Sequence, residues 1–334
     1  MFGIEVIDIS RFLMQASAGI CGATSLWGFV FWMKGRKDNG KGKSFRALSR
    51  IVFLLFLASI TVFLTSWIYT FFAFIPNVFA HEGIVIKPQA DEIIRGFMFN
   101  LPLVAMLTLI SFFGIIFFKS KSLFDKYGGI IFLSQFFLIS LILLFGAKSE
   151  FLRDQIFYSL HGWHSIITLG TVATIDTLYI ATFKNNPLKS ALYPFFPIMS
   201  AAIWIGLGID FASVFLIVKD TLHVTTQFLF NQMVVGIIVI NGAFLSGKIN
   251  DLLIGLIHPD RVESLSPKMN IFFGISGSLS IVSWTTITFL DFVNLPFSYA
   301  QFLLLYISVV IVAFFAHLAI EKAISARKVI PSVV

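Results

Sequence analysis

Two histidines, His161 and His164, stand three residues apart in the stretch LHGWHSIITLGTVATID, residues 160–176. Side chains at this spacing lie on neighbouring sides of one helical face, so both imidazoles could bind one metal ion, or one could ligate a haem. Further ligands would have to come from other elements, and His81 and His223 are the candidates. The spacing predicts a metal or haem site, with haem b or copper as the cofactor; a hydrogen-bonded histidine pair is the alternative interpretation.

Carboxylates and amides within apolar segments give a second candidate, formed by Asp176, Asp210 and Asn241. Ionisable groups in hydrocarbon cost a few kcal/mol or more, so they usually face the protein interior, a water cavity or a partner. These residues are therefore predicted to serve as separate steps of a proton or ion path. The competing interpretation is that they bond neighbouring hydroxyls and only lock helix packing.

An internal similarity links two polar segments of the chain. GWHSIITLGTVATID (162–176) aligns without gaps to GSLSIVSWTTITFLD (277–291), which matches Ser165 to Ser280 and Asp176 to Asp291. Eleven residues turn an α-helix by about 1100°, so the serine and the carboxylate of each segment are expected to share a face. The two segments are predicted to cross the membrane in opposite directions, which would make this an inverted repeat of the kind that many secondary transporters have.

The composition sets the class of protein that must position these residues. Hydrophobic residues make up 57% of the 334 residues and charged residues only 12%, against about 25% charged residues in soluble domains. The expected fold is an all-α integral membrane protein. Cys21 is the only cysteine, which excludes an internal disulfide and a cysteine-cluster metal site in this chain. No known catalytic motif occurs in a suitable context, so no independent enzyme activity is expected.

Nine segments are apolar over about 20 residues, the length that crosses a bilayer core. They are residues 12–33, 50–75, 97–118, 127–147, 157–183, 191–218, 225–246, 270–291 and 298–320. The sequence therefore predicts one membrane domain, 1–334, as a bundle of about nine transmembrane helices. The helices of 12–147 are mainly apolar, and those of 157–320 form the polar core.

The basic residues predict the orientation of the bundle. The connection 34–50 carries seven Lys or Arg, and 18 of the 24 basic residues fall in segments assigned to the same side. The positive-inside rule places that side in the cytoplasm, with the N-terminus outside and the C-terminus cytoplasmic. Because the basic residues lie between apolar spans, lipid headgroups are the expected anionic partner and nucleic acid is not. A prokaryotic plasma membrane is the expected location.

Three stretches resemble the helices of copper-resistance D-type and related uncharacterised membrane proteins. They are LMQASAGICGATSLWG, LHGWHSIITLG and MSAAIWIGLG. In that family a histidine precedes small residues and a Trp-x-Gly sequence. Here the corresponding positions are Met14 or Gln15 and Met199, so only the segment with His161 and His164 keeps the histidine. The resemblance implies metal or haem handling at that segment. LHGWHSIITLGT also resembles a short segment of cytochrome oxidase subunit III over about a dozen residues.

Three functions follow from these patterns as hypotheses. The first is a redox or metal-handling membrane subunit, because His81, His161, His164 and His223 are all predicted near the outer face. The second is a proton- or ion-coupled transporter of a small solute that uses Asp176, Asp210 and Asn241. The third is a non-catalytic assembly subunit bound to other membrane subunits.

Overall fold

The structure is a computed structural model that describes residues 6–38, 40–80, 87–145, 163–182, 185–218, 225–246 and 267–326. All regular secondary structure in these ranges is helical. Eight of the helices are long and apolar enough to cross a membrane. The chain divides into two compact units at residues 223 and 224, and each unit is described by itself.

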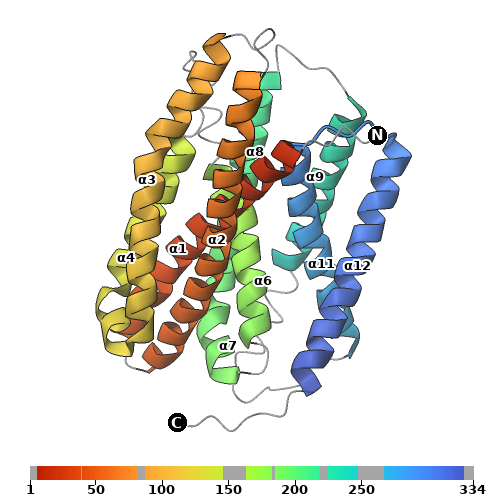
Figure 1. Cartoon of the computed structure of the whole chain (residues 1–334). Coiled ribbons are helices and arrows are strands. Elements are labelled where there is room, and N and C mark those ends of the chain that lie inside the picture. The colour runs from red at the N-terminus through yellow and green to blue at the C-terminus, as the bar shows by residue number, and fades with distance from the viewer. Residues whose placement is uncertain are drawn as a thin grey trace. The chain divides into compact units, whose positions relative to one another are not determined.

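The larger unit begins with four long helices, shown from red to yellow in Figure 1. They are α1 (Val6–Lys37), α2 (Gly42–Ala80), α3 (Lys87–Lys119) and α4 (Lys121–Phe145). Helix α1 packs against α2 and α4, and α3 packs against α4. Phenylalanine rings fill the space between them, with Phe53 in contact with Phe118, Phe124 and Phe132. Burying these large rings supplies much of the packing of this part of the bundle.

The second half of the larger unit has less regular helices. A π-helical turn, η1 (Ile166–Gly170), leads directly into α6 (Thr171–Thr182). After it come α7 (Asn186–Leu192), the 3-10 turn η2 (Tyr193–Phe195) and α8 (Phe196–Val218). The side chain of Asn185 caps α7 by accepting a hydrogen bond from the Leu188 N–H. Pro194 lies within η2, where it interrupts the α-helical hydrogen bonding before α8 begins.

The smaller unit contains three long helices, α9 (Thr226–Phe244), α11 (Pro267–Leu290) and α12 (Tyr299–Ala326). Helix α11 packs against both α9 and α12. Phe230 of α9 stacks on Phe302 of α12, with ring centroids 5.0 Å apart. Helix α12 presents large apolar side chains around most of its circumference, including Leu304, Val312 and Phe315. Such a surface suits a bilayer.

The prediction of an all-α membrane protein is confirmed for the described residues. Each of the nine predicted segments overlaps a helix, and eight of them meet the length and apolarity that a membrane span requires. In the segment 270–291, the described apolar stretch of α11 is Gly274–Leu290, although α11 as a whole runs from Pro267 to Leu290. The chain is therefore a multi-pass membrane protein. The count of nine spans and the orientation of the termini stay predictions.

Candidate functional site

The π-helical turn η1 is the main irregularity in the helix that carries His164 and Asp176. A π turn accommodates about one extra residue, and such turns occur frequently at functional sites. The hydroxyl of Thr171 donates to the carbonyl of Ile166, five residues earlier, rather than four. One extra residue rotates everything beyond it by about 100°. The expectation that Ser165 and Asp176 share a face assumed a continuous α-helix, and η1 makes it wrong.

Glycines let α1 approach this irregular helix more closely than other residues would allow. A Cβ atom added at Gly170 would lie 2.3 Å from the carbonyl oxygen of Gly19 and 2.7 Å from the Cβ of Ala23. A Cβ added at Gly19 would lie 2.7 Å from the carbonyl oxygen of Ser165. Both helices therefore pack backbone against backbone, as small-residue sequences allow in membranes.

Polar side chains bridge the same contact between α1 and the η1–α6 helix. The Gln15 amide donates to the hydroxyl of Ser165 at 3.2 Å, and the Trp27 indole N–H donates to the hydroxyl of Thr171 at 3.3 Å. We call the close contact and its bridges the polar seam; it comprises Gln15, Gly19, Ala23 and Trp27 of α1, with Ser165, Gly170 and Thr171 opposite. Buried hydrogen bonds of this kind fix both the register and the rotation of two packed helices.

His164 lies at the start of this helix and is buried, with 9% of its surface exposed. Its Nε2 atom is 3.3 Å from the hydroxyl of Thr168, which also donates to the His164 carbonyl at 2.7 Å. Within the described residues, no group of three or more His, Cys, Asp or Glu side chains lies close enough together to hold a metal ion. His81, His161 and His223 lie outside the described residues, so the predicted histidine cluster is not tested.

Four buried hydroxyls, which we call the hydroxyl line, occupy the turns between His164 and Asp176. Ser165, Thr168, Thr171 and Thr174 are all buried. Thr174 donates to the Gly170 carbonyl at 2.7 Å, so the threonines also satisfy carbonyls of their own helix. Asp176 follows two residues later on α6 and is partly buried. Helix α6, which carries Asp176, packs against α1, α2 and α8 of the larger unit.

Asp210 and Asn241 are the other two predicted path residues. Asp210 lies on α8, and its side chain is outside the described part. Asn241 belongs to the smaller unit, where its amide donates to the Ser276 carbonyl at 2.9 Å and accepts from the Ser276 hydroxyl at 2.5 Å. This reciprocal pair joins α9 to α11 and uses both ends of the amide. This contact gives Asn241 a packing role, and its predicted place in an ion path stays a prediction.

The repeat-like residues of α11 lie in regular α-helix. Ser280 is partly buried, and Asp291 is exposed directly after the last residue of α11, Leu290. Because α11 has no π turn in its described length, its geometry differs from that of the η1–α6 helix. The proposed duplication stays a prediction.

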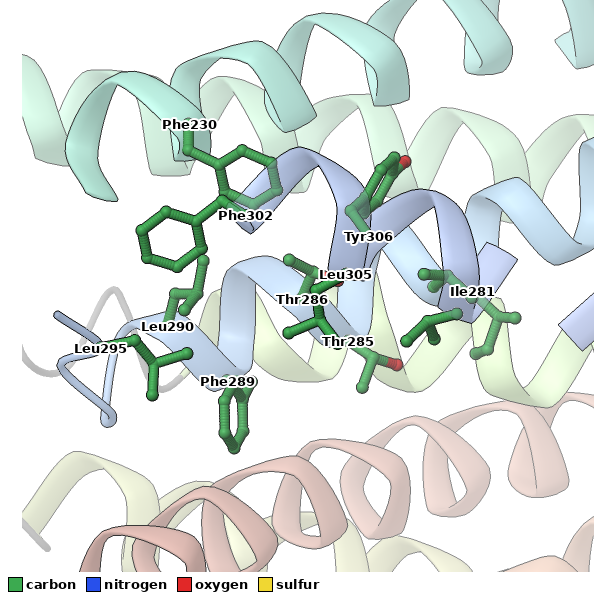
Figure 2. Close-up of a pocket in the computed structure, with 12 residues that line it drawn as sticks. Phe230, Ile281, Thr285, Thr286, Phe289, Leu290, Leu295, Phe302, Leu305 and Tyr306 are labelled. Carbon is green, nitrogen blue, oxygen red and sulfur yellow. The ribbon is translucent and has the colours of Figure 1, made fainter. Parts of the chain in front are cut away.

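An apolar pocket of about 310 Å³ lies among α9, α11 and α12 of the smaller unit. Figure 2 shows Phe230 and Phe302 close together toward one end of the pocket and Ile281 toward the other. Tyr306 also lines it, and its hydroxyl is 2.6 Å from the hydroxyl of Ser283. With so few polar groups, this pocket offers space for hydrocarbon and no arrangement for acid–base or metal chemistry.

Sequence reasoning missed three residues that organise these helices. Gln15 and Trp27 bridge the polar seam, and Gln227 donates to the Leu290 and Val293 carbonyls and accepts from the Leu295 N–H. The signal for both glutamines was present, since an amide in an apolar segment needs a partner. No signal in the sequence identified the π turn.

Comparisons with known protein families, with curated proteins and with solved structures found no match to this chain.

Proposed function

We propose that the chain is a proton- or ion-coupled membrane transporter in which the η1–α6 helix carries the path. One observation carries this proposal: a carboxylate, Asp176, stands in a helix long and apolar enough to span a membrane, and the preceding turns of that helix carry buried hydroxyls. A carboxylate inside a span is costly unless it is solvated or paired, and such residues mark proton and ion paths in many membrane proteins.

The geometry of the helix supports a path in two steps. His164 and Asp176 are twelve residues apart, which is about 18 Å along the helix axis. Ser165, Thr168, Thr171 and Thr174 occupy the interval, and each hydroxyl can both donate and accept a hydrogen bond. The π turn lies within this interval, and such turns occur frequently at functional sites.

The test uses the full chain in proteoliposomes on a solid-supported membrane, where a jump in external pH drives protonation without added solute. We expect a transient charge movement in the wild-type protein that Asp176→Asn removes and Asp176→Glu retains with a shifted pH midpoint. Asp291→Asn is the matched control, because that carboxylate is exposed at the end of α11. Full charge movement in a folded Asp176→Asn variant would overturn the proposal.

Asp210→Asn extends the same experiment to the second predicted path residue on α8. A reduced transient in this variant would add Asp210 to the path, whereas an unchanged transient would remove it. Thr174→Val tests the hydroxyl line and is expected to slow the charge movement more than to abolish it, because one hydroxyl can be bypassed by water.

Metal or haem binding is the second proposed function. It rests on His164, a buried imidazole at the end of the helix that carries the hydroxyl line. An absorbance spectrum and a metal analysis of the detergent-purified protein test it. Haem bands or stoichiometric copper that are lost in His164→Ala would support this function; a sample with neither would exclude it. Stable co-purification of a larger complex without a cofactor would favour an assembly subunit.

A further inference from the structure

Basic residues gather at the end of the larger unit where α1 ends and α2 begins. In the described parts of residues 34–50, 119–126 and 185–190, the acidic residues are Asp38 and Asp125. The basic residues of these three segments are Lys34, Arg36, Lys37, Lys41, Lys43, Arg46, Arg50, Lys119, Lys121, Lys126 and Lys189. We call this group the basic face.

Direct contacts hold the three segments together. The Arg46 guanidinium donates to the Gly35 carbonyl at 3.2 Å, and its Nε lies 3.7 Å from a carboxylate oxygen of Asp125. The Lys41 ammonium donates to the carbonyl and the hydroxyl of Ser190, at 3.1 and 2.9 Å. Residues from three distant parts of the sequence therefore form one continuous surface.

The two acidic residues do not balance this charge. The carboxylate of Asp38 accepts hydrogen bonds from the Lys41 and Gly40 N–H groups. The bond from Lys41 is the main reason that the pKa of Asp38 lies below its ordinary value, so this carboxylate stays ionised. Asp125 is engaged with Arg46. Lys37, Lys43 and Lys121 are exposed on the same surface.

Aromatic rings contact three of the basic side chains of this face. The Arg36 guanidinium lies over the Trp32 ring at 5.1 Å, and the Lys126 ammonium lies over the Tyr127 ring at 5.0 Å. The Arg50 guanidinium lies 5.4 Å from the ring of Phe118, and its Nη2 atom is buried with no hydrogen-bond partner among the described residues. Tryptophan and tyrosine concentrate where a membrane meets water, which is the level of lipid headgroups.

We propose that the basic face binds the headgroups of anionic phospholipids in the membrane that contains these helices. Phosphate oxygens accept charge-assisted hydrogen bonds from guanidinium and ammonium groups. Basic residues next to a membrane surface attract anionic lipid individually, and a cluster of four to eight is enough for recognition. The cluster here exceeds that number and is fixed in position by the Arg46 and Lys41 contacts. This proposal is independent of the proposed transport path, since the two share no residue.

Thermal unfolding of the full chain in detergent tests the proposal, with phosphatidylglycerol or phosphatidylcholine added at equal concentration. We expect phosphatidylglycerol to raise the Tm more than phosphatidylcholine, because a ligand of the folded state stabilises it. The triple variant Lys37→Gln, Lys43→Gln, Lys121→Gln should bind phosphatidylglycerol roughly tenfold or more weakly. The matched control replaces the same three lysines by arginine, which keeps the charge and should keep the Tm difference.

Three outcomes would overturn the proposal. They are equal Tm increases with the two lipids, an unchanged phosphatidylglycerol effect in the triple glutamine variant, and reproduction of the effect by inorganic phosphate. The last outcome would identify a site for free anions instead of lipid. If the triple variant does not fold, Lys121→Gln alone should show a smaller loss of the phosphatidylglycerol effect, and no loss would count against the lipid site.

Discussion

The two units of this protein join their helices in different ways. Along the polar seam of the larger unit, α1 and the η1–α6 helix meet through backbone atoms at Gly19 and Gly170, with polar bridges on either side. In the smaller unit, aromatic rings lie between α9 and α12, where Phe230 packs against Phe302 and Tyr306. Cβ atoms added at Gly236 and Gly277 would meet nothing within 4 Å, whereas one added at Gly274 would lie 2.8 Å from the His317 ring.

This difference shows where each unit is sensitive to change. A contact between backbones has no side chain that can move aside, so an added methyl group has to displace a helix. A contact between rings tolerates small changes of volume but depends on the groups that hold the helix ends, such as Gln227. We therefore expect the stability of the polar seam to depend mainly on the shape of the contact, and that of the smaller unit mainly on its hydrogen bonds.

The largest effect is expected from Gly170→Ala in the polar seam. Its Cβ would lie 2.3 Å from the Gly19 carbonyl oxygen, and overpacking of this kind costs about 1–3 kcal/mol, with backbone clashes at the upper end. Unfolding followed by tryptophan fluorescence in detergent measures the loss. Gly236→Ala is the matched control, because its Cβ has open space and alanine favours helix by about 1 kcal/mol. Equal stability of the two variants would remove the distinction between the units.

Gln227→Met should give the next largest loss, about 1–3 kcal/mol, because it leaves the Leu290 and Val293 carbonyls and the Leu295 N–H without their side-chain partner. The same unfolding assay reports it. Gln301→Met is the control, since that exposed side chain caps Ser298 at the start of α12 and water can replace it. A Gln227 variant as stable as wild type would show that hydrogen bonding does not limit the smaller unit.

Gln135→Met on α4 is expected to increase the stability of the protein, in contrast to the two substitutions above. Gln135 is fully buried, and neither polar atom of its side chain has a hydrogen-bond partner among the described residues. Methionine has nearly the same shape, so removing an unsatisfied amide should raise stability by about 1 kcal/mol. A stability loss in chemical or thermal unfolding would instead reveal an internal water bound to this amide.

The smallest effect concerns the pair between Asn241 and Ser276. Hydrogen bonds between membrane helices average about 0.6 kcal/mol in double-mutant cycles. We expect a coupling of this size from the stabilities of Asn241→Leu, Ser276→Ala and the double variant. If Asn241→Leu also removed the pH-driven charge movement without unfolding, Asn241 would have a place in the path besides its packing contact.

Much of the fold could be predicted from the sequence, whereas little of the site could. Long apolar segments can satisfy their backbone groups in a bilayer only as helices or closed barrels, so length and hydropathy were sufficient for the helices. The prediction that Ser165 and Asp176 share a face is wrong because a single extra residue in the π turn rotates the rest of the helix. The partner of Asn241 could not be predicted, because an amide in an apolar span indicates a polar partner but does not identify it.

The sequence by itself determined that this is a helical, multi-pass membrane protein with basic connections and a carboxylate in a span. Only the tertiary structure decided which polar groups meet. In the structure, Gln15 bonds Ser165, Trp27 bonds Thr171 and Asn241 bonds Ser276. Contacts such as that between Lys41 and Ser190 bring the three basic segments together. The physical reason is that apolarity acts on each segment separately, whereas a hydrogen bond between helices depends on their rotation and register, which close packing alone fixes.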